Sequence, residues 1–438
     1  MKRHVAWGFL FGAVLACRAD TPAGPCTLQD CIRIGLDHSG VAEIARRNQA
    51  IARTLVHQAR ADALPSISLI GTYTRLDELE SVDLGDGPVK LGTLDNYNVR
   101  AEVRQALYSG GRVVGALHAA RLNEHYADVT RQRTEAGLVR DICTGFYDIL
   151  LAKEAVGVRA ATVEQLERFR DQVARKHDKG AVSEFELLSA RVRLANERPL
   201  LIKARNDRDL AVAAFRRLLS VDDEAFRIEG ELAPVPEGRS LEELSALALQ
   251  RRPALRVLQT VVQLREVDRD VTRADGRPDL SVSFNYNGQN SYGFVSFDDD
   301  WQWHWNAGLT LSWNVWDGGL TRGKVEEKEL ELQKSRIQLA ETERDVKLEV
   351  RQAYLDMKHA EESLAASRGT VELAAKALDI ARVRHEAGVA TRLEFTDATV
   401  ELGRARLAVA VARHNQMAAV ARLHYACGLN LGPREEND

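Results

Sequence analysis

Apolar and polar side chains alternate in two parts of the chain. The alternating segments lie near residues 66–73, 98–107, 280–286 and 301–315. In the last of them, one side would carry Trp301, Trp303, Trp305, Ala307, Leu309, Leu311, Trp313 and Val315. A period of two with one apolar side is the pattern of a strand with one face away from water. The sequence therefore predicts four strands of about ten residues, a length that suits a membrane-spanning strand.

Two much longer segments have the pattern of helices. Residues from about 111 to 178 and from about 319 to 387 contain no proline, which would break a helix. At a rise of 1.5 Å per residue, each segment would form a helix of roughly 100 Å. In the second segment, apolar residues recur in steps of four and three, the spacing of a coiled-coil seam. These residues are Val346, Val350, Ala353, Met357, Ala360, Leu364, Val371, Ala374 and Leu378.

A lone glycine follows each of the two long segments. After Gly180 and Gly388, shorter helical patterns run over about 183–218 and 391–428. Glycine is the usual residue where a helix ends and the chain reverses. We therefore expect each long helix to be one arm of a helical hairpin.

The order of these features occurs twice. Tyr108-Ser109-Gly110-Gly111 matches Trp316-Asp317-Gly318-Gly319, and the offset is 319 − 111 = 208 residues. Lys179–Ser183 matches Ala387–Thr391 at the same offset. A repeat this long indicates a duplicated domain half rather than a solenoid unit. We expect a first repeat at residues 20–220, a linker or equatorial region at 221–240, a second repeat at 241–430 and a tail at 431–438.

Four strands do not close a barrel. An open strand edge is excluded from the lipid interior because its backbone groups would have no hydrogen-bond partner. If the strands enter a membrane, several chains must therefore share one barrel. Strand alternation alone leaves a soluble sheet with a tryptophan-rich core as the alternative, and the long helical hairpins favour the shared barrel.

Composition and motifs exclude several classes of function. The chain has 60 basic and 64 acidic side chains, so its charge gives no reason to expect a nucleic-acid partner. No HExxH motif, P-loop, Gly-x-Ser-x-Gly motif or clustered Cys/His set is present. The histidines are scattered along the chain. We therefore expect no enzyme, no catalytic residues, no cofactor and no metal site.

The N-terminus resembles a secretory signal. Lys2 and Arg3 precede an apolar stretch that is too short to span a bilayer, so residues 1–19 are interpreted as a signal peptide. The stretch ends at Ala16-Cys17, in a context similar to a lipobox. Lipidation of Cys17 and ordinary cleavage near Ala16 or Ala19 both remain open.

Export implies an oxidising compartment for the remaining cysteines. Cys26 and Cys31 could form a disulfide if Cys26 lies outside the helix that starts near Thr27. The alternative is that both are unpaired small apolar residues. Cys143 and Cys427 lie on apolar helix faces and are expected in the core.

Taken together, these motifs resemble the TolC family of outer-membrane efflux proteins over nearly the whole mature chain. The resemblance is carried by Thr27-Leu28-Gln29-Asp30-Cys31 with Ile34 and Leu36, Leu64-Pro65, Leu107-Tyr108-Ser109-Gly110-Gly111, Trp316-Asp317-Gly318-Gly319, and Gly388 through Phe395-Thr396-Asp397-Ala398. It implies a mainly α fold with a small β part. Long coiled-coil hairpins would form a periplasmic α-barrel, and four strands from each of three chains would form a shared twelve-stranded outer-membrane β-barrel.

The resemblance also implies function, location and partners. A protein of this family is an outer-membrane channel, the exit duct of a tripartite efflux or type I secretion system, which extends into the periplasm of a Gram-negative bacterium. Its partners would be two further copies, a periplasmic adaptor (membrane fusion protein), an inner-membrane transporter and outer-membrane lipid. A soluble periplasmic coiled-coil adaptor or scaffold is the alternative. The cargo, whether drug, metal ion or protein, does not follow from the sequence.

The family narrows its periplasmic end with an acidic pair after the second hairpin glycine. Those positions hold Glu394 and Asp397, which three chains would arrange as carboxylate rings that favour cations. The alternative is that both carboxylates stabilise a helix N-terminus or are simply solvated. The family's gate-linking arginine is replaced by Ala390, and Glu186 on the first hairpin could instead pair with Arg392.

The hairpin tips are where the family contacts its adaptor. The resemblance therefore makes Gly180, Ala181, Gly388 and Val389 candidate contact residues. Gly180 and Gly388 are also ordinary helix-ending glycines, and both roles are compatible.

Overall fold

The computed structural model describes residues 24–79, 81–83, 88–90, 92–234, 236–290, 301–387, 389 and 392–429. These residues form two compact units. One contains the strands and comprises Ala45–Arg133 and Pro253–Asp345; the other comprises Met1–Ile44, Thr134–Arg252 and Val346–Asp438. The predicted signal at 1–19, with Cys17, and the tail at 431–438 lie outside the described residues.

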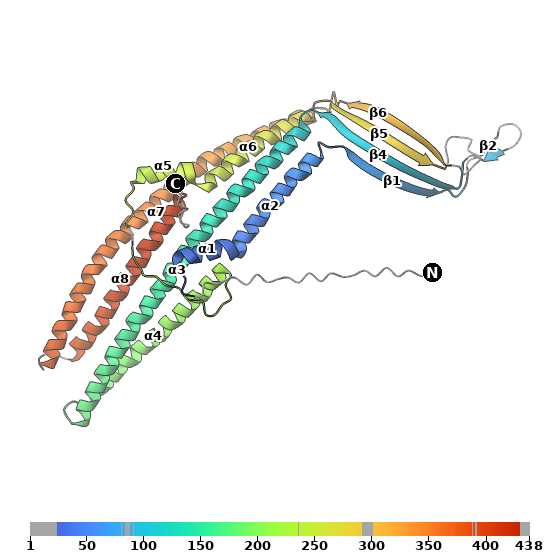
Figure 1. The fold of residues 1–438 in the computed structure, drawn as a ribbon. Helices are drawn as coiled ribbons and strands as arrows, with labels where there is room; N and C mark the ends of the chain where they lie inside the picture. The colour runs from blue at the N-terminus through green and yellow to red at the C-terminus, as the bar shows by residue number, and fades with distance from the viewer. Residues whose placement is uncertain are drawn as a thin grey trace, which may run out of the picture. The chain divides into compact units, whose positions relative to one another are not determined.

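The helices and strands follow the predicted order (Figure 1). The helices are α1 (Leu28–His38), α2 (Gly40–Ala61), α3 (Arg112–Asp178), α4 (Glu184–Leu219), α5 (Leu241–Arg251), α6 (Pro253–Ala274), α7 (Leu320–Glu386) and α8 (Arg392–Ala426). The strands are β1 (Ser66–Arg75), β2 (Ser81–Asp83), β3 (Pro88–Lys90), β4 (Asp95–Ser109), β5 (Asp279–Gln289) and β6 (Gln302–Ser312). The prediction of two long helices and four main strands is confirmed.

The four main strands form one antiparallel sheet in the order β1-β4-β5-β6. Residues that pair across strands share a face, so the register defines the two faces of the sheet. One row crosses the sheet as Leu69, Ala101, Tyr286 and Trp305. The neighbouring row, on the other face, is Ile70, Arg100, Asn287 and His304. The sheet therefore has one apolar face and one largely polar face, as the alternating pattern predicts.

Side-chain hydrogen bonds join the strands on the polar face. The Asn98 amide donates to Gln289 over 3.2 Å, and the Asn285 amide donates to Asn306 over 2.9 Å. The Arg100 guanidinium donates to the Asn287 amide oxygen over 3.0 Å. These bonds satisfy polar groups across three neighbouring strands and hold their register.

Aromatic rings lie on the apolar face. Tyr286 stacks on Trp303 with ring centroids 5.3 Å apart, and Phe284 stacks on Trp305 at 6.1 Å. Trp305 is 66% exposed in a single chain, although a large indole is normally covered by apolar groups. This face therefore needs a covering that the described residues do not supply.

Two details of the β region differ from the prediction. A second, two-stranded sheet of β2 and β3 lies between β1 and β4 in the chain, where the alternating pattern predicts no strand. Strand β6 spans Gln302–Ser312, so the predicted strand residues Trp301, Trp313 and Val315 do not lie on it. Trp313 instead donates its indole N–H to the Gly276 carbonyl over 3.2 Å, outside the strand ladder. The alternation of apolar residues continues beyond Ser312, so the pattern does not show where the strand ends.

The repeated Gly-Gly pairs sit where each sheet half passes into a long helix. Gly110 and Gly318, which occupy the same repeat position, both have positive φ, at 65° and 68°. In the second repeat, the Asp317 carboxylate accepts from the amides of Gly319 and Thr321 over 2.9 and 2.7 Å. Such bonds satisfy otherwise free N–H groups at the start of α7. The turn and the helix start are therefore encoded locally.

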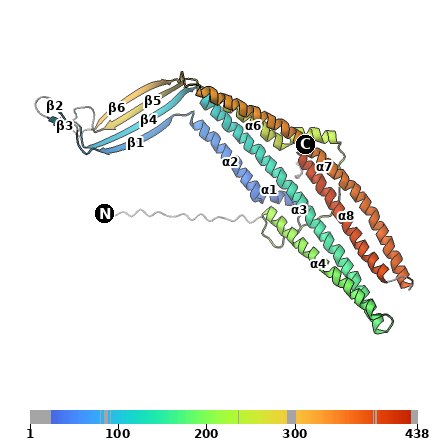
Figure 2. The same ribbon diagram turned by 180° about the vertical axis from the view of Figure 1, so that it is seen from behind.

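The helical unit has its main core where α1 packs against α3 and α4 (Figure 2). Phe146 on α3 and Phe215 on α4 meet edge to face at 6.4 Å. Gly145 permits this approach, because a Cβ there would lie 2.9 Å from the Phe215 ring. The other buried members include Ile32, Cys143, Ile142, Ile149, Leu219 and Phe226. Both views show α3 beside α4 and α7 beside α8, which are the two predicted hairpins.

The linker predicted at 221–240 lies between α4, which ends at Leu219, and α5, which begins at Leu241. Its described residues form no helix and one isolated bridge, between Ile228 and Cys26. The exact domain boundaries stay a prediction.

The cysteines for which pairing was left open are free thiols in this structure. Cys26 precedes the N-cap of α1, whose Thr27 and Asp30 form a capping box, and Cys31 lies one turn into the helix. Both are buried in the main core. Burial raises the pKa of the Cys31 thiol to about 12, so the group behaves as a small apolar side chain.

Comparison of the two equivalent glycines tests the junctions. A Cβ at Gly110 would lie 2.9 Å from the Ala274 carbonyl oxygen, whereas the space around Gly318 is open. We expect Gly110→Ala to destabilise by about 2–4 kcal/mol, from overpacking plus the left-handed backbone. Gly318→Ala should cost only the backbone term, about 1 kcal/mol. Thermal unfolding in detergent measures both, and equal midpoints would contradict the assigned close approach.

Candidate functional site

The first hairpin tip is closed by backbone hydrogen bonds. Gly180 has a φ of 70°, and its amide donates to the His177 carbonyl over 2.8 Å. The Ala181 amide donates to Lys176 over 2.9 Å. This pattern ends a helix with a left-handed residue and satisfies its last carbonyls. Gly180 and Ala181 are both exposed.

The second tip is described in part. The Val389 amide donates to the Arg384 carbonyl over 3.0 Å, the same five-residue step as Ala181 to Lys176 in the first tip. Val389 is 70% exposed. Gly388 and Ala390 lie outside the described residues, so the predicted role of Gly388 stays a prediction.

The two predicted gate carboxylates lie in the first turns of α8, and each has a basic neighbour. Asp397 forms an ion pair of 2.5 Å with Arg193 on α4, which joins the second hairpin to the first. Glu394 lies 3.9 Å from Arg384 on α7, within its own hairpin. Both carboxylates are about half exposed. The sequence indicated the two acids but not Arg193, the partner of Asp397.

Glu186 occupies the same repeat position as Glu394, since 394 − 186 = 208. Its backbone amide donates a hydrogen bond of 3.4 Å to the side-chain oxygen of Ser183, the N-cap residue of α4. The side chain of Arg392, its predicted partner, lies outside the described part of the chain. The pairing of Glu186 with Arg392 therefore stays a prediction.

An aromatic cluster also joins the hairpins near their tips. The ring centroids of Phe169 on α3 and Phe395 on α8 are 5.5 Å apart. The His385 ring on α7 stacks on Phe395 with a centroid distance of 5.9 Å. Phe169 is 5% exposed and also packs with Val173 and Leu187 of the first hairpin. Sequence reasoning missed this cluster. Phe395 was part of the quoted motif, but nothing in the sequence indicated which residues it touches.

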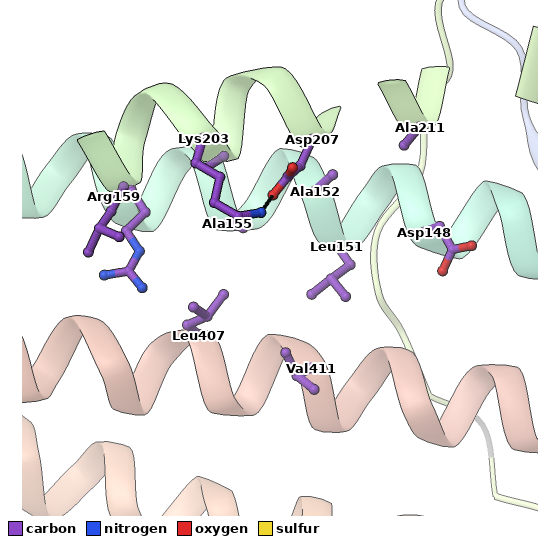
Figure 3. A pocket seen from close by; sticks show the side chains of 12 residues that line it. Asp148, Leu151, Ala152, Ala155, Arg159, Lys203, Asp207, Ala211, Leu407 and Val411 are labelled. Atoms are coloured by element: carbon purple, nitrogen blue, oxygen red, sulfur yellow. Dashed lines mark hydrogen bonds and ion pairs between the residues drawn. The ribbon is translucent and has the colours of Figure 1, made fainter. Parts of the chain in front are cut away.

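Two grooves run along the helical unit. One lies between α3, α4 and α8 and has a volume of about 460 Å³ (Figure 3). Leucine, valine and alanine side chains line its middle, and Asp148, Arg159, Lys203 and Asp207 lie along it. The other lies between α4 and α8 near the tips, and it is lined by Phe185, Leu188, Val192, Arg193, Asp397 and Arg404, among others. Both are open surfaces rather than closed cavities.

Within the described residues, no three His, Cys, Asp or Glu side chains gather as a metal site requires. No helix described in the structure has a run of apolar residues that is long enough to cross a membrane. The chemistry of the described site is therefore that of exposed carboxylates, arginines and apolar side chains on long helices.

Comparison with known proteins decides the family. The sequence profile of the Outer membrane efflux protein family matches residues 43–221 and 244–429, and so covers both repeats. The chain belongs to this family. Membership places it in the outer membrane as a transport protein, and the two matched segments correspond to the duplication seen in the sequence.

Curated relatives share about a quarter of their residues with the chain. Outer membrane protein TolC of Escherichia coli is 24% identical over 398 residues, which cover 85% of this chain and 76% of TolC. Alkaline protease secretion protein AprF of Pseudomonas aeruginosa is 24% identical over 449 residues, which cover 98% of this chain and 89% of AprF. The similarity therefore extends over most of this chain and over at least three quarters of each relative.

Solved structures of outer-membrane channels share the fold. The CmeC channel of Campylobacter jejuni matches with a TM-score of 0.78 at 14% identity and covers 92% of this chain and 85% of CmeC. The open state of MtrE of Neisseria gonorrhoeae matches with a TM-score of 0.77 at 18% identity, over 92% and 89%. The hairpins and the four-stranded sheet are thus those of an outer membrane efflux protein.

A pair of phenylalanines tests the aromatic cluster. Phe169→Ala should destabilise the helical unit by about 3–5 kcal/mol, because it empties a buried site. Phe185→Ala is the control, since Phe185 is 78% exposed, and its cost should stay within about 0.5 kcal/mol. Hydrogen exchange of the segments around 165–190 and 380–400 would report both. Equal protection in the two variants would contradict the assigned contacts.

Proposed function

We propose that three copies of this outer membrane efflux protein form a continuous exit duct. A periplasmic adaptor and an inner-membrane transporter deliver the cargo to its periplasmic end. The observation that carries the proposal is the four-stranded sheet, which has a continuous apolar face and two unpaired edges. The alternative of a soluble periplasmic scaffold would leave this face in water.

The sheet edges explain why one chain is not enough. Among the described residues, no strand pairs with the outer edge of β1 or of β6. A lipid-exposed edge is excluded because its N–H and C=O groups would stay unpaired. Since successive strands are antiparallel, β6 of one copy meets β1 of the next in the antiparallel sense. This head-to-tail contact closes into a ring, and three copies supply twelve strands.

An uncovered seam on α4 supports contact between copies in the helical part. Leu188, Val192, Ala195, Pro199 and Ile202 follow one another in steps of four and three, and all are exposed. That spacing is the seam of a coiled coil, which normally packs against another helix. In a ring of copies, the seam would face a helix of the neighbouring chain.

Glu394 and Asp397 would lie around the periplasmic end of such a ring. Three copies bring six carboxylates to this end, and carboxylate rings favour cations. The ion pair between Asp397 and Arg193 offsets part of that charge. We expect rupture of the Asp397 pair to accompany widening of the opening.

The tips provide the surface for the adaptor. Gly180, Ala181 and Val389 are exposed, and Phe185, one turn into α4, is 78% exposed. An exposed phenylalanine beside backbone turns suits a protein partner with an apolar helix tip. We include Gly388 in the proposed adaptor contact because of its position in the sequence repeat, although it lies outside the described residues.

A pair of arginine substitutions tests the membrane assignment of the sheet. Leu309 lies on the apolar face and Thr310 on the polar face. An arginine on a lipid-facing strand position costs about 2–4 kcal/mol near the bilayer centre. Leu309→Arg should therefore reduce the amount recovered as a detergent-stable trimer from outer membranes, whereas Thr310→Arg should not. Recovery of the unsubstituted protein in the soluble periplasm would overturn the channel.

Ion selectivity in planar bilayers tests the acidic ring. The double variant Glu394→Gln with Asp397→Asn should shift the reversal potential in a salt gradient toward zero, because it removes the carboxylates at the opening. The matched control is Glu164→Gln with Asp209→Asn. Those acids are also exposed and paired with arginines, but they lie away from the tips. An unchanged potential in the first variant would remove Glu394 and Asp397 from the gate.

A further inference from the structure

Helix α8 packs along α3 through three contacts at separate heights, and these join the second hairpin to the first. Gly403 approaches α3 so closely that a Cβ there would lie 2.7 Å from the Thr162 hydroxyl oxygen. Arg413 lies 4.0 Å from Glu154. His414 contacts Asp148, with 2.6 Å between Nε2 and the carboxylate. The third contact is the shortest, and it involves the one group among these that titrates near neutral pH.

The surroundings of the His414 ring favour its protonated form. Nε2 faces the Asp148 carboxylate, and Nδ1 lies 3.2 Å from the Asn415 side-chain oxygen. A neutral imidazole has a single N–H and would leave one of these oxygen contacts without a donor. The imidazolium has two N–H groups and satisfies both. The His414 side chain is only 14% exposed, so water competes little for either bond.

Taken together, the groups around the ring also raise the pKa of His414. The hydrogen bond that His414 donates to the Asp148 carboxylate, on α3, raises the pKa of His414, while burial lowers it by a smaller amount. Asn415, beside the ring on α8, raises the pKa further as a neutral acceptor. Arg422, on the same helix, opposes protonation. The net direction is upward, so the stabilising pair is fully present below the pKa of a free histidine and is lost as pH rises through the raised value.

The described ion pairs between the two hairpins differ in whether they contain a histidine. Arg193–Asp397 and Arg413–Glu154 each join an arginine to a carboxylate and contain no histidine. His385 lies in the aromatic cluster of Phe169 and Phe395. His414–Asp148 is an ion pair between described parts of α3 and α8 that contains a histidine, so its strength depends on pH near neutrality.

We propose that His414 and Asp148 form a pH-sensitive brace between the two helical hairpins. Below the titration of His414, the pair holds α8 against α3. At higher pH the ring is neutral, the pair weakens, and α8 is held only by packing and by the arginine pairs. His414 is a positioning residue in this role, because it acts on the orientation of α8 and not on the cargo.

The brace bears on the gate because both lie on one helix. Asp397 precedes His414 by 17 residues, which corresponds to roughly 26 Å along α8. A change in how α8 is held at His414 therefore reaches the acidic end of the hairpin. This consequence rests on the proposed channel function, whereas the brace itself does not.

Hydrogen exchange of the full-length protein in detergent tests the brace without a channel assay. At pH 5.5, amides in 402–418 should exchange about three- to tenfold faster in His414→Gln than in the unsubstituted protein, because a hydrogen bond to a charged group is lost. At pH 9 the two should agree. Asp148→Asn should behave in the same way, and its side chain is 58% exposed, so folding is not at risk.

The control for this experiment is His424→Gln. His424 lies on the same helix and pairs with the Glu237 carboxylate at 2.7 Å, but Glu237 belongs to the linker and not to α3. This variant should keep the pH-dependent protection of 402–418. Equal exchange in His414→Gln and the unsubstituted protein at pH 5.5 would overturn the brace. A difference of the same size at pH 5.5 and pH 9 would also overturn it, since the role would then be structural.

Conductance in planar bilayers tests the consequence for the gate. The unsubstituted channel should conduct more at pH 9 than at pH 5.5. The His414→Gln variant should conduct at both pH values as the unsubstituted channel does at pH 9. A variant that keeps the full pH dependence would disconnect the brace from the gate. Absence of any conductance would instead contradict the proposed channel, and the exchange experiment would still decide the brace.

Discussion

Backbone hydrogen bonding at the two sheet edges is the constraint on which the architecture of this protein depends. The strands β1 and β6 each leave a row of N–H and C=O groups unpaired in a single chain. Water could satisfy those groups, but the apolar face beside them, with Trp303, Trp305 and Leu309 exposed, is not suited to water. Lipid is a suitable environment for the apolar face of the sheet. It is unsuitable for the unpaired edges of β1 and β6, because lipid offers their backbone groups no hydrogen-bond partner. The proposed edge-to-edge pairing of copies would meet both requirements together.

The helical part reaches its form by a different route. Local signals begin and end each hairpin: positive-φ glycines, the Asp317 cap of α7 and the Ser183 cap of α4. The hairpins are then joined by a few contacts, namely an aromatic cluster, arginine–carboxylate pairs and the pair of His414 with Asp148. Exposed ion pairs of this kind are individually weak, with a typical value of about 0–1 kcal/mol. The core contacts within each hairpin are instead apolar, between buried side chains such as Leu166 and Leu194 in the first and Leu364 and Val409 in the second.

Much of the fold could be predicted because it is written in periodic patterns. The expected helix at about 111–178 is observed at Arg112–Asp178, and that at about 319–387 at Leu320–Glu386. Proline-free length and bounding glycines were sufficient for this. Strand β6 was overestimated because apolar alternation continues beyond Ser312. The small β2–β3 sheet was missed because three-residue strands carry too short a pattern to be recognised.

The candidate site was predictable only in part. Motif spacing located Glu394 and Asp397, but their partners Arg384 and Arg193 depend on how α7 and α4 lie against α8. Asp148 and His414 are 266 residues apart, and no local pattern relates them. By itself, the sequence determined the duplicated hairpins and the two faces of the sheet, because periodicity is a property of single segments. Only the tertiary structure decided which charges and rings meet across the hairpins, because these contacts depend on the packing of helices that are distant in the chain.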